Sequence, residues 1–312
     1  MPRFAMLSLL LTCLVFHADP TLRAQDNQEV AKLVEQLKDK EAVNRSKAAL
    51  ELAAIGPKAA PAVPALIDTL KDENAEVRSH AVFALGQIGP DAKKAVPALV
   101  ASFKDKDKMV RRLAVDAIGR LGPDAKEALG DVIALLKDDE LGPRAADALV
   151  RFGPLAKEAI PQLAAALKAP AIRPYAAFTL GKLGKDSLPA LIEAFKDKET
   201  DVRIDVVIAL GMLGADGVPA LASALKDKEA DVRLNAISSI AKMGADGKAA
   251  VPALAEVLKD SDEEIRIRSA RALGFLGADA KAAVPALEAA KDDKDKNVKD
   301  AVLQALERIQ GK

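Results

Sequence analysis

The stretch LKDKEADVRLNAI, residues 225–237, decides the fold, because FKDKETDVRIDVV stands thirty residues earlier, at 195–207. A catalytic site is normally built once, whereas a phrase repeated at a fixed interval encodes a structural unit copied along the chain. The repetition therefore predicts a stack of similar units, and their period has to be established before any function is considered.

A glycine closes each copy of the pattern and sets the period. From residue 25 onward these glycines recur every 30–33 residues, and Gln310 takes their place in the last copy. The sequence thus predicts nine repeats of 30–33 residues that fill residues 25–312. The closing glycines are Gly56, Gly89, Gly122, Gly153, Gly184, Gly214, Gly244 and Gly277.

Each repeat is predicted to form two helices. The first begins near a proline, as in VPALIDTLKD from Val63, because proline suits the first helical turn. The second begins at DVR or EVR and carries apolar residues at helical spacing. It ends at the closing glycine, for which the left-handed conformation is expected. Helices this short are marginal alone in water, so neighbouring pairs must stack.

The pattern DxxxxVRxxAxxALGxLG, preceded by PAL, resembles the bacterial HEAT-like repeat and covers residues 25–312. The resemblance implies an all-α fold, a right-handed α-solenoid of about nine antiparallel helix pairs whose second helices line the concave side. Such repeats serve scaffolds, adaptors and a few enzymes alike, so the resemblance does not choose among these functions.

A recurring aspartate and arginine, such as Asp227 and Arg233, are predicted to form a structural ladder. Identical groups at every step cannot all serve one reaction centre, so hydrogen bonds between neighbouring turns are favoured over a row of acid and base pairs. Repeat four has Gly142 at the arginine position, with Arg144 two places on, and the last repeat has Lys299. The ladder arginines are Arg45, Arg78, Arg111, Arg173, Arg203, Arg233 and Arg266.

A second column, three residues before each closing glycine, holds mostly glycine or alanine, for example Gly211 and Ala241. Glycine inside a helix costs about 1 kcal/mol relative to alanine, so its recurrence predicts close approach of adjacent helices. Glu307 occupies this position in the last repeat, which predicts that the last helix is a C-terminal cap.

Residues 1–24 are predicted to be a secretory signal peptide. Arg3 precedes an apolar run from residue 4 to 16, which is too short to span a bilayer, and cleavage is expected after Ala24. The protein is therefore expected to be exported, to the periplasm or the extracellular space, with no membrane span. The sequence LLTC fits a lipoprotein cleavage box poorly, which leaves lipidation of Cys13 as an open alternative.

Little in residues 25–312 favours catalysis. This part has one histidine, His80, no cysteine, and no phosphate-binding loop, HExxH or GxSxG motif. Some HEAT-like proteins are hydroxylases or resemble bilin lyases, and such an enzyme is the alternative function. Lysine plus arginine equals aspartate plus glutamate, 46 each, and tryptophan is absent, which disfavours nucleic-acid partners. No catalytic residue, metal or cofactor is predicted.

The second helices supply the candidate binding surface. Counted from the ladder arginine as zero, positions two, five and nine share one helix face, with nine Lys or Arg against three Asp. This face is either an ordinary solvated surface or a groove for another protein or peptide, acidic and extended. Repeats four and five, with Pro143 and Pro174, are expected to bend the groove. The candidate residues are Arg120, Arg144, Arg151, Tyr175, Phe178, Lys182, Phe83, Lys242, Arg268, Arg271 and Phe275.

Overall fold

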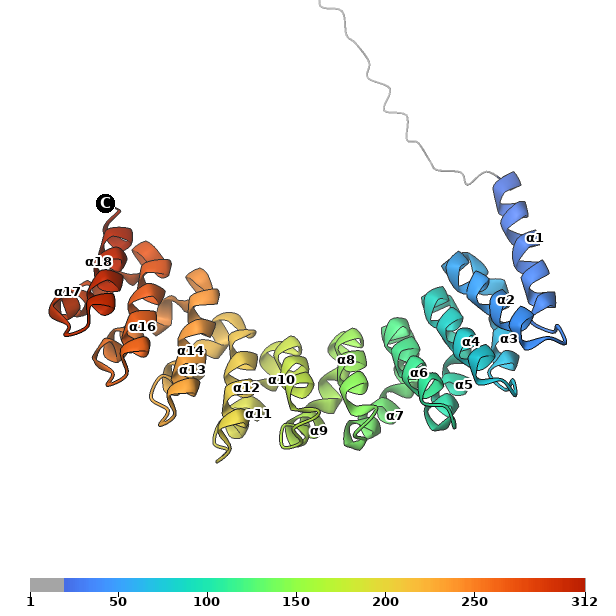
Figure 1. Ribbon diagram of the computed structural model, residues 1–312, viewed down its shortest axis with the longest axis horizontal. Coiled ribbons are helices and arrows are strands. Elements are labelled where there is room, and N and C mark those ends of the chain that lie inside the picture. The colour runs from blue at the N-terminus through green and yellow to red at the C-terminus, as the bar shows by residue number, and fades with distance from the viewer. Residues whose placement is uncertain (1–19, 312) are drawn as a thin grey trace, which may run out of the picture.

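The structure, a computed structural model, describes residues 20–311 as an arc of stacked helix pairs (Figure 1). The even-numbered helices lie along the inner side of the arc and the odd-numbered helices along the outer side. Within these residues every regular element is helical and no strand occurs. The protein is thus an all-α solenoid, as the repeat pattern predicts.

The helices alternate between the two layers in chain order. The outer, first helices are α1 (Pro20–Gln36), α3 (Val63–Thr69), α5 (Val96–Ala101), α7 (Leu129–Ala134), α9 (Ile160–Ala166), α11 (Leu188–Ala194), α13 (Val218–Ala224), α15 (Val251–Glu256) and α17 (Val284–Ala289). The inner, second helices are α2 (Ala42–Ile55), α4 (Ala75–Ile88), α6 (Lys108–Leu121), α8 (Gly142–Arg151), α10 (Arg173–Lys182), α12 (Thr200–Gly211), α14 (Ala230–Lys242), α16 (Glu263–Leu276) and α18 (Lys296–Gln310).

Local sequence signals set where these helices begin. Proline occupies the first turn of most outer helices, as Pro64 does in α3. Backbone N–H groups in the first turn have no partner within the helix, so the N–H that proline lacks is not needed there. The inner helix α4 begins after Asn74, whose side chain accepts hydrogen bonds from the backbone N–H groups of Glu76 and Val77. Asp107, Asp262 and Asp295 cap α6, α16 and α18 in the same way.

The closing glycines end the inner helices in a conformation that differs from the expected one. Gly56 has φ 65° and ψ −135°, and Gly277 has φ 54° and ψ −130°. The positive φ was predicted, but these ψ values lie far from the left-handed helical region, in a part of φ/ψ space that favours glycine still more strongly. The chain therefore turns directly into a short 3₁₀ segment that leads to the next outer helix.

These 3₁₀ segments are η1 (Gly56–Ala62), η2 (Gly89–Ala95), η4 (Gly122–Ala128), η6 (Gly153–Ala159), η7 (Gly184–Ser187), η8 (Gly214–Gly217), η9 (Gly244–Ala250) and η11 (Gly277–Ala283). Four more end outer helices: η3 (Ser102–Lys104), η5 (Leu135–Lys137), η10 (Val257–Lys259) and η12 (Ala290–Asp292).

The column of small residues lies where adjacent inner helices are closest. A Cβ added to Gly119 would lie 3.0 Å from Cβ of Ala148, and one added to Gly274 would lie 3.0 Å from Cα of Ala305. Such contacts are too tight for a larger side chain, so the helices can pack at this distance only because the position is small. Glu307 at the same position of α18 is exposed.

The first outer helix bears on the predicted signal peptide. Residues 1–19 lie outside the described part, and α1 begins at Pro20, so the expected cleavage after Ala24 falls within this helix. Val30 and Leu33 of α1, and Leu37 directly after this helix, are buried, and all three follow the cleavage point. The contacts of these three residues with the core would therefore survive removal of residues 1–24.

One described segment, Ala42–Thr69, is long and apolar enough to cross a membrane by length and composition alone. It comprises α2, η1 and α3, and the chain turns at Gly56 between them. The segment is thus two short helices of neighbouring repeats joined by a 3₁₀ turn.

Candidate binding surface on the inner wall

Ion pairs between successive repeats fix the frame that carries the inner wall. Nε and Nη2 of Arg78 donate to Asp105 Oδ2 and Oδ1 at 2.8 and 2.7 Å, and its Nη1 donates to the backbone carbonyls of Asp72 and Glu73. Each arginine thereby closes its own turn and clamps the next one, with a bidentate geometry that lysine cannot supply. The bidentate pairs are Arg45–Asp72, Arg78–Asp105, Arg203–Asp227 and Arg266–Asp293. Arg233 pairs with Asp260 in the same place, but only its Nη2 donates a hydrogen bond, at 3.2 Å, while its Nε has no hydrogen-bond partner.

The ladder changes its partners in the middle of the chain. Arg111 contacts Glu140 at 2.5 Å instead of the aspartate of the next turn. Arg173 lies 3.4 Å from Glu199 and 3.6 Å from Asp201, and its Nε donates to the backbone of its own turn. These pairs are monodentate or long, so they constrain the neighbouring repeat less than a bidentate pair does.

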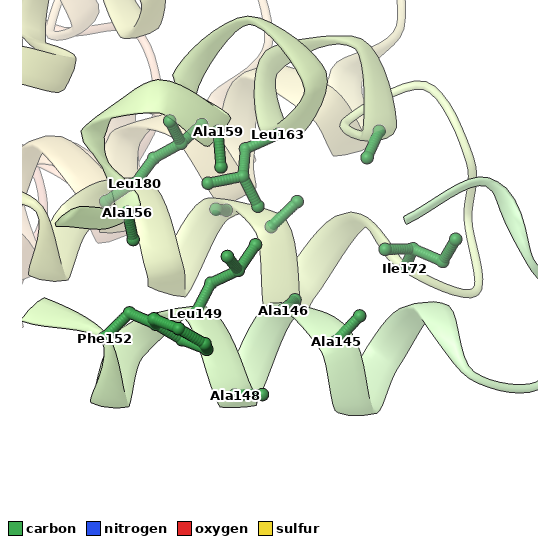
Figure 2. Close-up of a cluster of buried hydrophobic side chains, with 14 of the residues drawn as sticks. Ala145, Ala146, Ala148, Leu149, Phe152, Ala156, Ala159, Leu163, Ile172 and Leu180 are labelled. Atoms are coloured by element: carbon green, nitrogen blue, oxygen red, sulfur yellow. The ribbon is translucent and has the colours of Figure 1, made fainter. Parts of the chain in front are cut away.

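Repeats four and five are joined by apolar contacts instead of a ladder pair. Gly142 stands at the arginine position of repeat four, and a Cβ there would lie 2.6 Å from Cδ1 of Ile172. Figure 2 shows the buried cluster at this junction, with Leu149 of α8 pointing toward Leu163 of α9. The isoleucine fills the space that an arginine would need, which explains why a glycine interrupts the column.

Most of the candidate binding residues are open to solvent on the inner helices. Nine of the eleven are exposed, while Phe83 and Arg144 are half-buried. Arg144 does not replace the missing ladder arginine: it lies on the inner wall, and its Nη1 donates to Asp116 at 2.6 Å. The helical register read from the sequence therefore separates the wall from the core.

The candidates on α6 and α8 surround one shallow hollow of about 230 Å³, lined also by Asp116 and Asp147. Besides the bond between Arg144 and Asp116, Arg151 lies 3.5 Å from Asp147, and Arg120 donates to Gln87 across the repeat boundary. The two aspartates neutralise two of the three arginines. The hollow is therefore a mixed-charge site with a small positive excess.

An exposed apolar group follows on α10 and α12. Tyr175, Phe178 and Ile208 are each between 46% and 49% exposed, and the ammonium of Lys182 lies 5.3 Å from the centre of the Phe178 ring. Asp205 on α12 was not among the predicted residues, although it occupies position two. Burial raises the pKa of its carboxyl, while Arg173 opposes this shift and Asp201 adds to it.

The remaining candidates lie toward the C-terminal end of the wall. Phe275 is 67% exposed, and the guanidinium of Arg308 stacks over its ring at 5.1 Å. Arg271 lies one turn before Phe275 on α16, whereas Arg268 forms an ion pair with Glu264 on the same helix. Arg308 was not among the candidate residues, although it occupies position nine of the last repeat, and that position would have identified it.

The described residues offer little that resembles a reaction centre. Oγ of Ser46 lies 2.6 Å from Nδ1 of His80, but Ser46 is 6% exposed and therefore shielded from substrates. This contact joins α2 to α4. Among residues 20–311, no group of three or more His, Cys, Asp or Glu side chains is placed to hold a metal ion.

Solved structures with a similar fold include the karyopherin Kap121p and importin beta. Kap121p, in its complex with Nup53p, is 13% identical, with a TM-score of 0.65 over 91% of this chain and 37% of its own. Importin beta is 14% identical with a TM-score of 0.63 over 92% of this chain and 47% of its own. The chain thus spans less than half the length of these proteins. At this identity the likeness concerns the fold alone.

Human deoxyhypusine hydroxylase, in complex with glycerol, is 25% identical over 94% of this chain and all of its own. Its TM-score of 0.35 is too low for a common overall shape, so the enzyme supplies no argument about function. Curated proteins give no significant sequence match.

The family relationship is established by the repeats themselves. A model of HEAT repeats matches residues 30–108, 63–150, 160–231 and 218–307, which together cover most of the chain. The matches coincide with the helix pairs, the ion-pair ladder and the packing column described above. This protein belongs to the HEAT repeat family.

Proposed function

We propose that this protein is an exported, non-enzymatic scaffold that binds another protein through the inner wall of its solenoid. The observation that carries the proposal is the row of exposed arginine and aromatic side chains on the inner helices. Arginine and aromatic residues are enriched where proteins recognise one another. Kap121p, which shares the fold, is bound to Nup53p in one crystal structure and to the extreme C-terminus of the protein phosphatase Cdc14p in another.

The expected partner is an extended segment, because the inner wall is long and curved (Figure 1) and the hollow on α6 and α8 is small, about 230 Å³. The hollow on α6 and α8 would take a mixed-charge portion of that segment, and Tyr175 and Phe178 would cover an apolar portion beside it. No observation on the described residues favours the alternative, an enzyme related to HEAT-like lyases or hydroxylases.

The test compares two inner-wall variants in a pull-down with residues 25–312 as bait, followed by identification and affinity measurement of the partner. Arg120→Glu with Arg151→Glu reverses charge in the hollow, and Tyr175→Ala with Phe178→Ala removes the aromatic rings. Both should weaken binding at least about tenfold. The charge-reversal variant should keep the melting temperature of the parent, because exposed charges contribute little to folding, and the melting temperature of the aromatic variant is measured beside it.

A matched control keeps the same change in charge away from the wall. Lys126→Glu with Lys248→Glu alters two exposed lysines in η4 and η9 and should leave affinity within about twofold of the parent. If the control and both wall variants bind the same partner as tightly as the parent, the inner wall is not the binding surface.

Export is tested separately. Mass measurement of the protein recovered from the periplasm or the medium should give a chain that begins at Gln25. A recovered chain that still carries Met1 or Arg3 would contradict the signal-peptide assignment. A mass that includes a lipid on Cys13 would instead identify the lipoprotein alternative.

A further inference from the structure

The inner wall is not uniformly charged, and its unpaired cations gather at the C-terminal end. Lys242, Phe275 and Arg308 occupy position nine of α14, α16 and α18, and Arg271 lies one turn before Phe275. We name these four residues the C-terminal patch. All four are exposed, and within residues 20–311 the three cations have no carboxylate within 4.0 Å.

The contrast with the central hollow lies in position five. In the hollow this position holds Asp116 and Asp147, which pair with two of the arginines. In repeats eight and nine it holds Arg271 and Gln304, so no carboxylate from this column faces the cations. The nearby acids are engaged or directed elsewhere: Glu264 pairs with Arg268, and exposed Glu307 occupies the packing column at the end of the solenoid.

The patch is also preorganised. A Cβ built on Gly274 would lie 3.6 Å from Cδ of Arg308, so the stem of this arginine rests on the small position of α16. Its guanidinium then covers part of the Phe275 ring, while the N–H groups at its edge remain available to an acceptor. Binding at this arginine therefore costs less side-chain entropy than binding at an arginine that rotates freely.

We propose that the C-terminal patch is the anchor for an acidic, extended segment of a partner protein. Carboxylates of the segment pair with Arg271 and Arg308, with Lys242 adding long-range attraction, and a proline or other flat apolar group covers the open part of the Phe275 ring. The proposal rests on the proposed function of the inner wall, and it names the chemistry of the partner and moves the main anchor from the central hollow to the end of the arc.

The probe for this proposal is a labelled synthetic peptide of repeating Glu-Glu-Pro, about eighteen residues long, which is extended in solution. Its neutral counterpart has Gln in place of Glu. The parent protein should bind the acidic peptide and not the neutral one, with an affinity that falls as salt is raised. Arg271→Glu with Arg308→Glu should weaken binding at least about tenfold, and Phe275→Ala about threefold to tenfold.

The matched control is Lys126→Glu with Lys248→Glu, which makes the same change of charge away from the inner wall and should bind the acidic peptide within about twofold of the parent. Equal loss in both charge-reversal variants, or no loss in the C-terminal one, would overturn the proposal, as would failure of the parent to bind the acidic peptide. Tighter binding to a single-stranded oligonucleotide or to phosphatidylglycerol vesicles would overturn the assignment to a protein.

Failure of the C-terminal anchor can be distinguished from failure of the inner wall as a binding surface. A natural partner that is released by the central variant, Arg120→Glu with Arg151→Glu, but not by the C-terminal one leaves the inner wall as the binding surface and removes the anchor. A partner released by neither variant removes both. Circular dichroism melts of every variant show whether a loss of binding reflects unfolding, and the Phe275→Ala variant gives an independent reading without any change of charge.

Discussion

The ion-pair ladder makes a sharp prediction about stability when one arginine is replaced by a residue of similar shape without charge. Arg78 is 4% exposed and makes two bonds to Asp105 and two to backbone carbonyls. Arg78→Met removes all four and leaves the carboxylate, whose side chain is 13% exposed, without its cation. Breaking a buried pair from one side typically costs about 3–5 kcal/mol.

The expected loss for Arg78→Met is near the lower end of that range, about 3 kcal/mol, because Asp105 keeps one backbone hydrogen bond from Asp107. The matched control is Arg111→Met, at the same position one repeat later. Its pair with Glu140 is more open, with side-chain exposures of 25% and 29%, so the expected loss is smaller than for Arg78→Met.

Urea unfolding followed by circular dichroism measures the free-energy differences, and hydrogen exchange locates them. Long repeat arrays can depart from two-state unfolding, so protection of the amides in α4 and α6 is the more direct readout. The double variant Arg78→Met with Asp105→Asn should recover part of the loss, since no buried charge is then left unpaired. If Arg78→Met costs no more than Arg111→Met, the ladder is not a main source of stability.

The other predictions concern packing and pH. Gly211→Leu should destabilise by about 1–3 kcal/mol, because even a Cβ there would lie 2.8 Å from Ser239, whereas Met212→Leu should cost less than about 1.5 kcal/mol in thermal melts. Gly142→Ala should cost about 1 kcal/mol or more by pressing on Ile172, and a neutral result would mean that this side chain moves freely. Hydrogen bonds from Arg266 lower the pKa of Asp293, so its stabilising contribution is complete above an unfolded-state pKa of about 3.9 and is lost as the pH falls through the lower, folded-state pKa. Melting temperatures should fall on acidification below about pH 4, and less steeply in Asp293→Asn.

The sequence predicted the solenoid well because its evidence is periodic. Proline at the start of the outer helices and glycine after the inner ones recur in nearly every repeat, so each boundary is indicated many times. The backbone angles at the closing glycines were predicted less well. A single glycine indicates a positive φ but does not choose ψ, and the structure has ψ −135° at Gly56 where the left-handed helix would have a positive value.

The central junction shows a second limit of the pattern. Gly142 was recognised as a departure, and Arg144 two places on was the nearest cation. Position in sequence could not reveal that Ile172, from the next repeat, fills the vacant ladder space. Such a substitution depends on contacts between repeats, whereas the pattern describes each repeat by itself.

The candidate surface depends on the same distinction. Columns of positions identified most of the exposed side chains, because exposure follows largely from the register of one helix, although Phe83 and Arg144 are half-buried. They did not identify which charges remain available, because Arg144 is neutralised by Asp116 of the preceding repeat. Adding charges along a column therefore overstates the attraction at the centre of the wall and understates the contrast with its C-terminal end. Local charge on the inner wall therefore depends on position five: Asp116 and Asp147 pair with arginines of the hollow, whereas Arg271 adds a cation that has no carboxylate within 4.0 Å among residues 20–311.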